Sequence, residues 1–273
     1  MAIFRSVLLT ATLTLTAIAA PAVAAPGTLV AAGDEWLLTN TAYTGIYTGG
    51  TTAFVNNIAT TFGGSNYLFL TGDAPTGGQS GLTSVSAQLT SLGKTVAYSA
   101  VLPADLSPYD AVFHIGQGLA TTAQLSTYVA GGGNLYISLG GGYFGGAAGE
   151  ANFWNPFLAN YGLVAGSSWF TDPNFVNATV TTGPVGVTNL LWGYGQSIDA
   201  IANSSGVSYV RGDFTNGLKN VGLIGTSRLL AVPGAVPEPA SWTMLIAGFG
   251  IVGGTLRRRT TRSSAMVAAV KSA

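Results

Sequence analysis

The chain has 273 residues, of which 48% are hydrophobic and only 7% are charged, so it can build a sizeable core with few ion pairs. It contains no cysteine and one histidine, which excludes disulfides, thiolate nucleophiles and multi-histidine metal centres. No cofactor is expected, because the sequence has no complete cofactor-binding motif. Residues 25–235 hold four basic and nine acidic side chains, a net charge of −5, so no nucleic-acid-binding surface is expected there.

The first 24 residues have the pattern of a secretory signal peptide. Arg5 precedes an uncharged, mostly apolar run over residues 7–20, and small residues follow it. The predicted cleavage site is formed by Ala22, Ala24 and Ala25, with the cut before Ala25. The alternative is an uncleaved membrane helix, but the run is short and contains four threonines, which favours cleavage. This signal predicts passage through a secretion translocon.

Residues 25–230 are expected to form the exported domain. After a short apolar run at 36–38, apolar residues recur at helical spacing or in short continuous runs. The predicted helices are 52–62, 82–92, 121–130 and 150–161, and the predicted strands are 67–70, 95–101, 111–115 and 134–139. This alternation predicts an α/β fold with a parallel sheet covered on both faces. Four further strands, at 179–182, 207–210, 221–224 and 228–232, are expected to complete or flank the sheet.

Three segments carry the residues of a family resemblance: Tyr109–Phe113, Gln124–Val129 and Gly131–Ile137. Together they resemble the glutamine-amidotransferase-like or trehalose-utilisation-like branch of the flavodoxin-type folds, which implies a three-layer domain. Active members of that branch place a cysteine nucleophile at a sharp turn after a strand and a histidine later in the chain. Here the turn reads Gly140-Gly141-Gly142-Tyr143 and no histidine follows, so the resemblance implies no catalytic role.

Four features of the domain have a functional and a structural interpretation. His114 is either a general base at a carboxyl strand end or a core histidine, and the core is favoured. Residues 140–146, which include Tyr143 and Phe144, could cradle a phosphate, but a plain loop is favoured because no lysine follows. Asp34-Glu35 and Asp172-Pro173-Asn174 are sparse for a calcium site.

The aromatic residues of the second half form the fourth feature. They could stack on sugar rings, but the helical spacing of the first three fits core burial better. The set is Trp154, Phe157, Tyr161, Trp169, Phe170 and Trp192.

The C-terminal part has the pattern of a membrane anchor. A small-residue and proline linker at 231–239 precedes residues 240–256, which carry no charge and are long enough, at about 25 Å, to cross most of a bilayer. The basic tail 257–273 follows, and its arginines predict a cytoplasmic end, with the domain on the other side of the membrane. Glycines in the helix allow a second helix to approach closely.

One ordered set of residues in this part carries a second resemblance. Pro237-Glu238-Pro239 is followed by Trp242, by Gly248 and Gly250 in the apolar segment, and then by Arg257, Arg258 and Arg259. This order resembles the PEP-CTERM sorting signal of Gram-negative bacteria. The resemblance implies recognition by an exosortase-type membrane processing enzyme, removal of the helix, and delivery of the domain to the cell surface or extracellular matrix. The tail beyond Arg259 is longer than is usual in that family.

The sequence thus predicts an exported cell-envelope protein with a non-catalytic binding or structural role, with exopolysaccharide as a candidate partner. One alternative is an extracellular hydrolase-like enzyme that uses His114. The other is a binding module that stays anchored in the membrane.

Overall fold

The computed structural model describes residues 25–72, 78–115, 122–170, 177–180, 187–193, 195–214 and 217–228. All of these residues belong to one structural unit. The predicted signal peptide, linker, membrane helix and basic tail lie outside the described residues. Within the described ranges, none of the helices combines the length and the hydrophobicity needed to span a bilayer.

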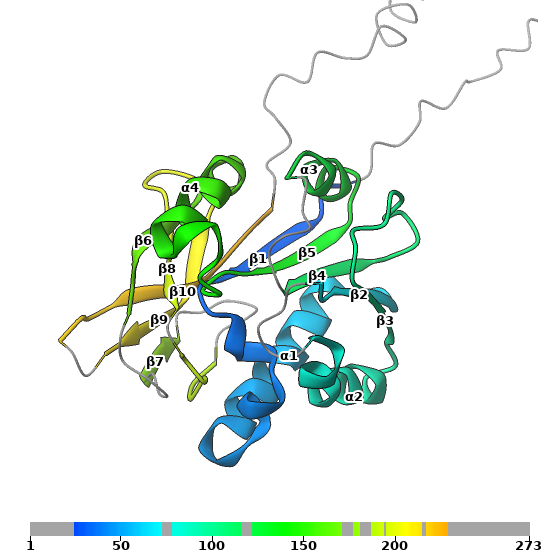
Figure 1. The fold of residues 1–273 in the computed structure, drawn as a ribbon, viewed down its shortest axis with the longest axis horizontal. Coiled ribbons are helices and arrows are strands. Elements are labelled where there is room, and N and C mark those ends of the chain that lie inside the picture. The colour runs from blue at the N-terminus through cyan, green and yellow to red at the C-terminus, as the bar shows by residue number, and fades with distance from the viewer. Residues whose placement is uncertain are drawn as a thin grey trace, which may run out of the picture. The chain divides into compact units, whose positions relative to one another are not determined.

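Five parallel strands form one half of the central sheet, in the order β3-β2-β4-β5-β1 (Figure 1). Most of their side chains are buried because helices cover both faces, which explains why these strands are nearly continuous apolar runs. Their bounds are β1 Thr28–Ala32, β2 Asn66–Leu70, β3 Thr95–Ser99, β4 Ala111–Ile115 and β5 Asn134–Ser138.

The helices form two layers around this sheet. Helices α1 (Thr48–Phe62) and α2 (Thr83–Ser91) bury their apolar stripes in one core. Helices α3 (Thr122–Ala130) and α4 (Ala147–Leu158) pack in the other core (Figure 1). Short 3₁₀ helices complete the connections: η1 Glu35–Leu38, η2 Asn40–Tyr43, η3 Gly45–Tyr47, η4 Gly78–Leu82, η5 Tyr143–Gly145 and η6 Ala159–Tyr161.

Three antiparallel strands extend the sheet beyond β1, in the order β10-β9-β7. They are β10 (Val221–Arg228), β9 (Val207–Asp213) and β7 (Asn177–Val180). A second, two-stranded antiparallel sheet pairs β6 (Leu163–Trp169) with β8 (Gln196–Ala200). The three-layer α/β architecture is therefore confirmed, with a mixed and mostly parallel central sheet.

The prediction of a parallel, flavodoxin-like sheet needs two corrections. The flavodoxin order runs 2-1-3-4-5, whereas here the N-terminal strand β1 occupies the position beside β5. The C-terminal strands are antiparallel, and for β9 and β10 the reason is that only seven residues, 214–220, separate them. A connection this short can form a hairpin turn but cannot carry the crossover that a parallel pair requires.

The predicted elements of residues 52–161 are confirmed to within a few residues, and 111–115 coincides with β4. The predicted strands at 179–182, 207–210 and 221–224 overlap β7, β9 and β10, which complete the sheet. The predicted strand 228–232 is described only at its first residue, the last of β10. Three strands were missed: β1, β6 and β8.

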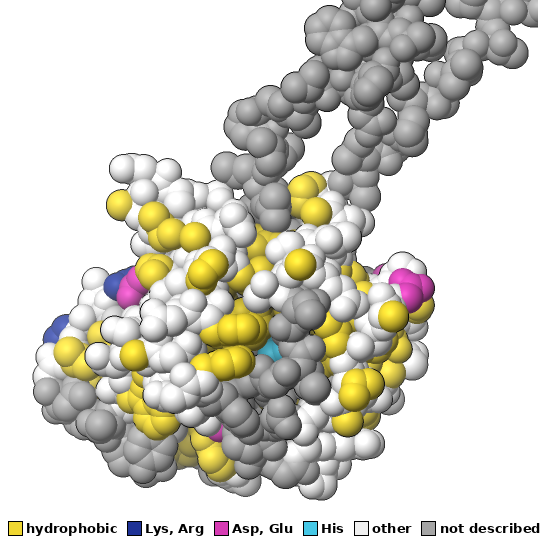
Figure 2. Space-filling view, turned by 45° about the horizontal axis from the view of Figure 1, so that its top comes forward, with side chains coloured by type: hydrophobic (Ala, Val, Ile, Leu, Met, Phe, Trp, Pro, Cys, Tyr) yellow, Lys and Arg dark blue, Asp and Glu magenta, His cyan; other side chains and the backbone are white. Residues whose placement is uncertain are grey.

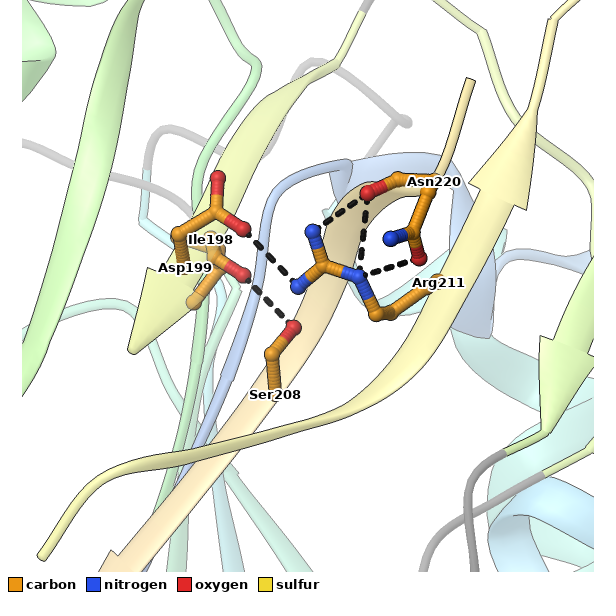
Figure 3. A network of polar contacts seen from close by, with 5 residues as sticks. All are labelled: Ile198, Asp199, Ser208, Arg211 and Asn220. Carbon is orange, nitrogen blue, oxygen red and sulfur yellow. Dashed lines mark hydrogen bonds and ion pairs between the residues drawn. The ribbon is translucent and has the colours of Figure 1, made fainter. Parts of the chain in front are cut away.

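A small polar network joins the second sheet to the central sheet (Figure 3). Arg211 on β9 forms an ion pair with Asp199 on β8, with 3.0 Å between Nη1 and Oδ1, and donates from Nε to Asn220 at 2.7 Å. Ser208 on β9 donates a hydrogen bond to the carbonyl of Ile198. The ion pair is partly exposed, so it adds at most about 1 kcal/mol. Charged side chains are sparse on the face drawn in Figure 2, as the composition implies.

The first and last described strands are hydrogen-bonded neighbours. β1 and β10 run antiparallel, and Thr28 at the start of β1 pairs with Arg228 at the end of β10. The start of the first described strand and the end of the last one therefore lie side by side, at the same end of two interior strands of the central sheet.

Asn134 fastens three elements to each other at the start of β5. Its Oδ1 accepts from the Thr28 N–H at 3.0 Å, and its Nδ2 donates to the carbonyls of Phe62 and Asp110, both at 3.0 Å.

We expect Asn134→Ala to lower the free energy of unfolding by about 2 kcal/mol, because partly buried backbone groups lose their partners. Urea unfolding measures this. Asn160→Ala, which removes an exposed amide bonded to Pro156, is the matched control and should change stability by less than about 0.5 kcal/mol; equal effects would contradict the assignment.

Candidate functional site

The carboxyl ends of β1 and β5 meet closely because these strands are parallel neighbours in register. Ala32 pairs with Ser138, and the N–H of Leu139 donates to the Ala32 carbonyl at 2.9 Å. Gly140 follows with a φ of 95°, a conformation that favours glycine. A Cβ at this position would lie 2.7 Å from the carbonyl oxygen of Gly33, so only glycine permits this approach. Open α/β sheets bind ligands at carboxyl strand ends, so this edge is a candidate site.

Asp34 is buried at this edge, and its two carboxyl oxygens accept hydrogen bonds from two separate segments. Oδ1 accepts from the Trp36 N–H at 2.9 Å and so caps η1, and Oδ2 accepts from the Gly193 N–H. Burial raises the pKa of Asp34 to about 7, although the two N–H donors act in the opposite direction. Asp34 is therefore a structural cap whose carboxyl is partly protonated at neutral pH.

Two more buried carboxyls, Glu35 and Glu150, complete what we call the carboxyl cluster. Glu150 on α4 accepts from the Gly140 N–H at 2.9 Å. Burial, followed by the charges of Asp34 and Glu150, raises the pKa of Glu35 to about 8. The Oε2 of Glu35 has no hydrogen-bond partner within the part of the chain that the structure describes. Such a cluster can retain protons at neutral pH.

The carboxyl cluster does not have the arrangement of a metal site. Within the described ranges, no group of three or more His, Asp and Glu side chains is placed to hold a metal ion. Asp34 and Glu35 therefore give no support to the calcium interpretation, and residues 172–174 lie outside the described residues.

His114 lies near the end of β4 and is fully buried. Its ring meets Trp154 edge to face, with 5.2 Å between the ring centroids. Burial lowers the pKa of His114 to about 4, so the imidazole is neutral at pH 7. A general base works best with a pKa near the operating pH, and among the described residues no acidic side chain is hydrogen-bonded to the His114 ring. The geometry thus favours the core interpretation over the catalytic one.

Most of the aromatic set belongs to the two cores. Trp154, Phe157 and Tyr161 are buried along α4 and η6, whereas Phe170 and Trp192 pack against Phe214. The sugar-stacking interpretation is therefore wrong for these five members, because their faces are not accessible.

Trp169 is the exception in the aromatic set, since 37% of its surface is exposed. It lies against Gly142, in the glycine-rich segment after β5.

The glycine-rich segment does not form the predicted phosphate cradle. The N–H of Gly140 donates to the carboxyl group of Glu150, so a side chain of this domain already occupies the place of an anion. Phe144 has a φ of 50° and stacks on Phe153, with 4.2 Å between the ring centroids. The favoured interpretation, a loop, agrees with this geometry.

Sequence reasoning missed how Glu150 and Gln196 contribute to this edge. Gln196 on β8 donates its backbone N–H to the Gly33 carbonyl at 2.8 Å, and its buried side-chain amide has no hydrogen-bond partner among the described residues. Their positions could not be inferred from spacing. The one available signal was an acidic residue in a first helical turn directly after a glycine-rich segment.

Of the predicted sorting and cleavage residues, Ala25 alone lies in the described part of the chain, where it is exposed and without regular structure. Ala22 and Ala24 lie outside the described residues. The same holds for Pro237, Glu238, Pro239, Trp242, Gly248, Gly250, Arg257, Arg258 and Arg259.

Comparison with known families finds a match to the PEP-CTERM protein-sorting motif at residues 235–259. The chain carries a PEP-CTERM sorting motif. The PEP-CTERM motif implies an exported protein that an exosortase sorts to the cell surface. No curated protein and no solved structure matches the chain, so the amidotransferase-like resemblance of the domain has no support from these comparisons.

Proposed function

We propose that this chain is a precursor whose exported domain reaches the cell surface or extracellular matrix, where it has a non-catalytic binding or structural role. The PEP-CTERM motif at 235–259 carries this proposal. The proposed route begins at the secretion translocon, with a signal peptide over residues 1–24. It continues through an inner-membrane intermediate anchored by 240–256 and ends with processing by an exosortase.

Two features of the domain support a non-catalytic role. The turn after β5 carries Gly140, whose N–H is bound to Glu150, in place of a nucleophile. The single histidine is buried against Trp154 and is neutral at pH 7. A domain with few charges and many small polar residues also suits a hydrated polysaccharide layer, which makes exopolysaccharide a candidate partner.

The mass of the mature chain tests the sorting step. In wild-type cells we expect a chain that lacks both the first 24 residues and the C-terminal helix. Replacing Arg257, Arg258 and Arg259 together with alanine should leave the C-terminal helix in place, because these arginines fix the cytoplasmic end of the anchor.

Replacing Arg262 and Lys271, basic residues beyond the matched motif, is the matched control and should leave processing unchanged. A wild-type chain that still ends at Ala273 would favour the permanently anchored module and reject sorting. An amide- or sugar-hydrolysing activity that is abolished by His114→Ala would favour the hydrolase-like alternative.

A further inference from the structure

A groove of about 720 Å³ opens at the amino ends of β4 and β5, opposite the carboxyl cluster. We call it the amino-edge groove. Most of its lining comes from residues 104–107, 109 and 110, from helix α3 and from the turn 131–134. Its volume falls within the range of about 300–1,000 Å³ that is typical of small-molecule sites.

The charged side chains that line the amino-edge groove are both acidic, and Lys94 lies beside the groove, where its Nζ donates to the carbonyl of Gly64 at 2.6 Å. Asp105 and Asp110 line it, and no lysine or arginine is among its lining residues. The N–H of Ser107 donates to Asp105 at 2.8 Å and lowers the pKa of that carboxyl. Hydrogen bonds from backbone N–H groups likewise lower the pKa of Asp110. Both carboxylates are therefore ionised at neutral pH, which disfavours an anionic ligand.

The Asp110 carboxylate is held in place before any ligand arrives. Its Oδ2 accepts from the N–H groups of Ser65 at 2.7 Å and Asn66 at 2.9 Å. The side chain lies so close to Gly64 that a Cβ at residue 64 would collide with it. The two backbone bonds both go to Oδ2, and Asp110 is one of the residues that line the groove.

Two tyrosines supply aromatic surface in the same groove. The ring of Tyr128 lies over Gly133, where a Cβ would collide with the ring atoms. Its hydroxyl donates to the Tyr109 carbonyl at 2.9 Å, which links the two tyrosines. Both side chains are partly exposed, in contrast to the buried aromatic residues of α4. Fixed rings lose little conformational entropy on binding.

We propose that the amino-edge groove binds an uncharged sugar chain. Sugar hydroxyls can donate to the fixed carboxylates, and the apolar faces of sugar rings can pack on tyrosine rings. Negative charge in the lining selects against uronic-acid and other anionic chains. This inference deepens the proposed binding role, because it names the ligand class and the place where the ligand binds.

Calorimetric titration of the purified mature protein with soluble neutral glycans (dextran, cello-oligosaccharides and mannan) tests the proposal. We expect at least one of them to bind, and neither alginate, which is anionic, nor chitosan oligosaccharides, which are cationic, to bind more tightly.

Asp105→Asn should weaken binding about tenfold or more, since a charge-assisted hydrogen bond is lost. Tyr109→Ala should weaken it about 2- to 12-fold, whereas Tyr109→Phe keeps the ring and most of the affinity.

Asp213→Asn is the matched control for Asp105→Asn. Asp213 on β9 also accepts from a backbone N–H, that of Asn220 at 2.8 Å, but it does not line the groove. This variant should bind like wild type. The proposal is overturned if no neutral glycan binds, if a charged polymer binds more tightly, or if Asp105→Asn and Asp213→Asn have equal effects. Sugar binding by a chain that still ends at Ala273 would reject the sorting proposal alone, and sorting without sugar binding would reject this inference alone.

Discussion

Replacing Phe113 with alanine is expected to lower the free energy of unfolding by about 3–5 kcal/mol, the usual cost of truncating a fully buried phenylalanine. Phe113 lies on β4 in the middle of the parallel half of the sheet. Its ring stacks on Phe69, with 4.5 Å between the centroids, and contacts the rings of Tyr67, Tyr136 and Phe62. Removing the ring leaves a cavity among four aromatic neighbours and loses their edge and face contacts.

Urea unfolding followed by tryptophan fluorescence measures this loss. Phe144→Ala is the matched control because the same atoms are removed from a ring that is 44% exposed. We expect the control to cost less than about 1 kcal/mol. If both variants lowered the urea midpoint equally, the aromatic contacts across β2, β4 and β5 would not be a major source of stability.

The second large effect is a fall in stability as the pH rises from 6.5 to 8. The pKa of Asp34 is raised from 3.8 to about 7 and that of Glu35 from 4.5 to about 8, both chiefly by burial. Across this window the folded chain holds protons that the unfolded chain releases, so unfolding becomes more favourable with each step in pH. One such proton is worth about 1.4 kcal/mol per pH unit, and the two groups together give a loss of about 2–3 kcal/mol.

His114 acts in the opposite direction below this window. Its pKa is lowered from 6.5 to about 4, so the unfolded chain binds a proton that the folded chain does not, and stability is lost as the pH falls through this range. Between pH 5 and 6.5 it offsets part of the carboxyl effect, which is why the slope is steepest above 6.5.

Thermal unfolding at pH 6.5, 7.2 and 8 measures the slope. Glu35→Gln should flatten it, whereas Asn160→Ala, which removes an exposed amide and no titratable group, should leave it unchanged. A stability that rises with pH across this window would show that the two buried carboxyls are ionised in the folded chain.

Local patterns in the sequence were enough to locate most helices and the central parallel strands. The spacing of apolar residues defines α1, and a continuous apolar run marks β4. β1 was missed because it is a five-residue strand just after the predicted cleavage site. The antiparallel half depends on pairing between residues far apart, such as Thr28 with Arg228, which no local pattern encodes.

The candidate sites show the same limit. Asp34 and Glu35 are neighbours in the sequence, but Glu150 reaches them only because β5 lies beside β1. The amino-edge groove likewise combines residues from three separate segments, so its two carboxylates and two tyrosines have no common motif. By contrast, the sorting motif is a continuous stretch, and it could be found from the sequence alone.

The pairing of β1 with β10 places the two ends of the described domain next to each other. Since Thr28 and Arg228 are neighbours, a short peptide could join them, and new ends could be opened in an exposed turn such as that at Gly93 without breaking a strand. Such a circular permutant would still contain every sheet pairing described here. Segments attached before β1 and after β10 can therefore be exchanged without changing the packing inside the domain.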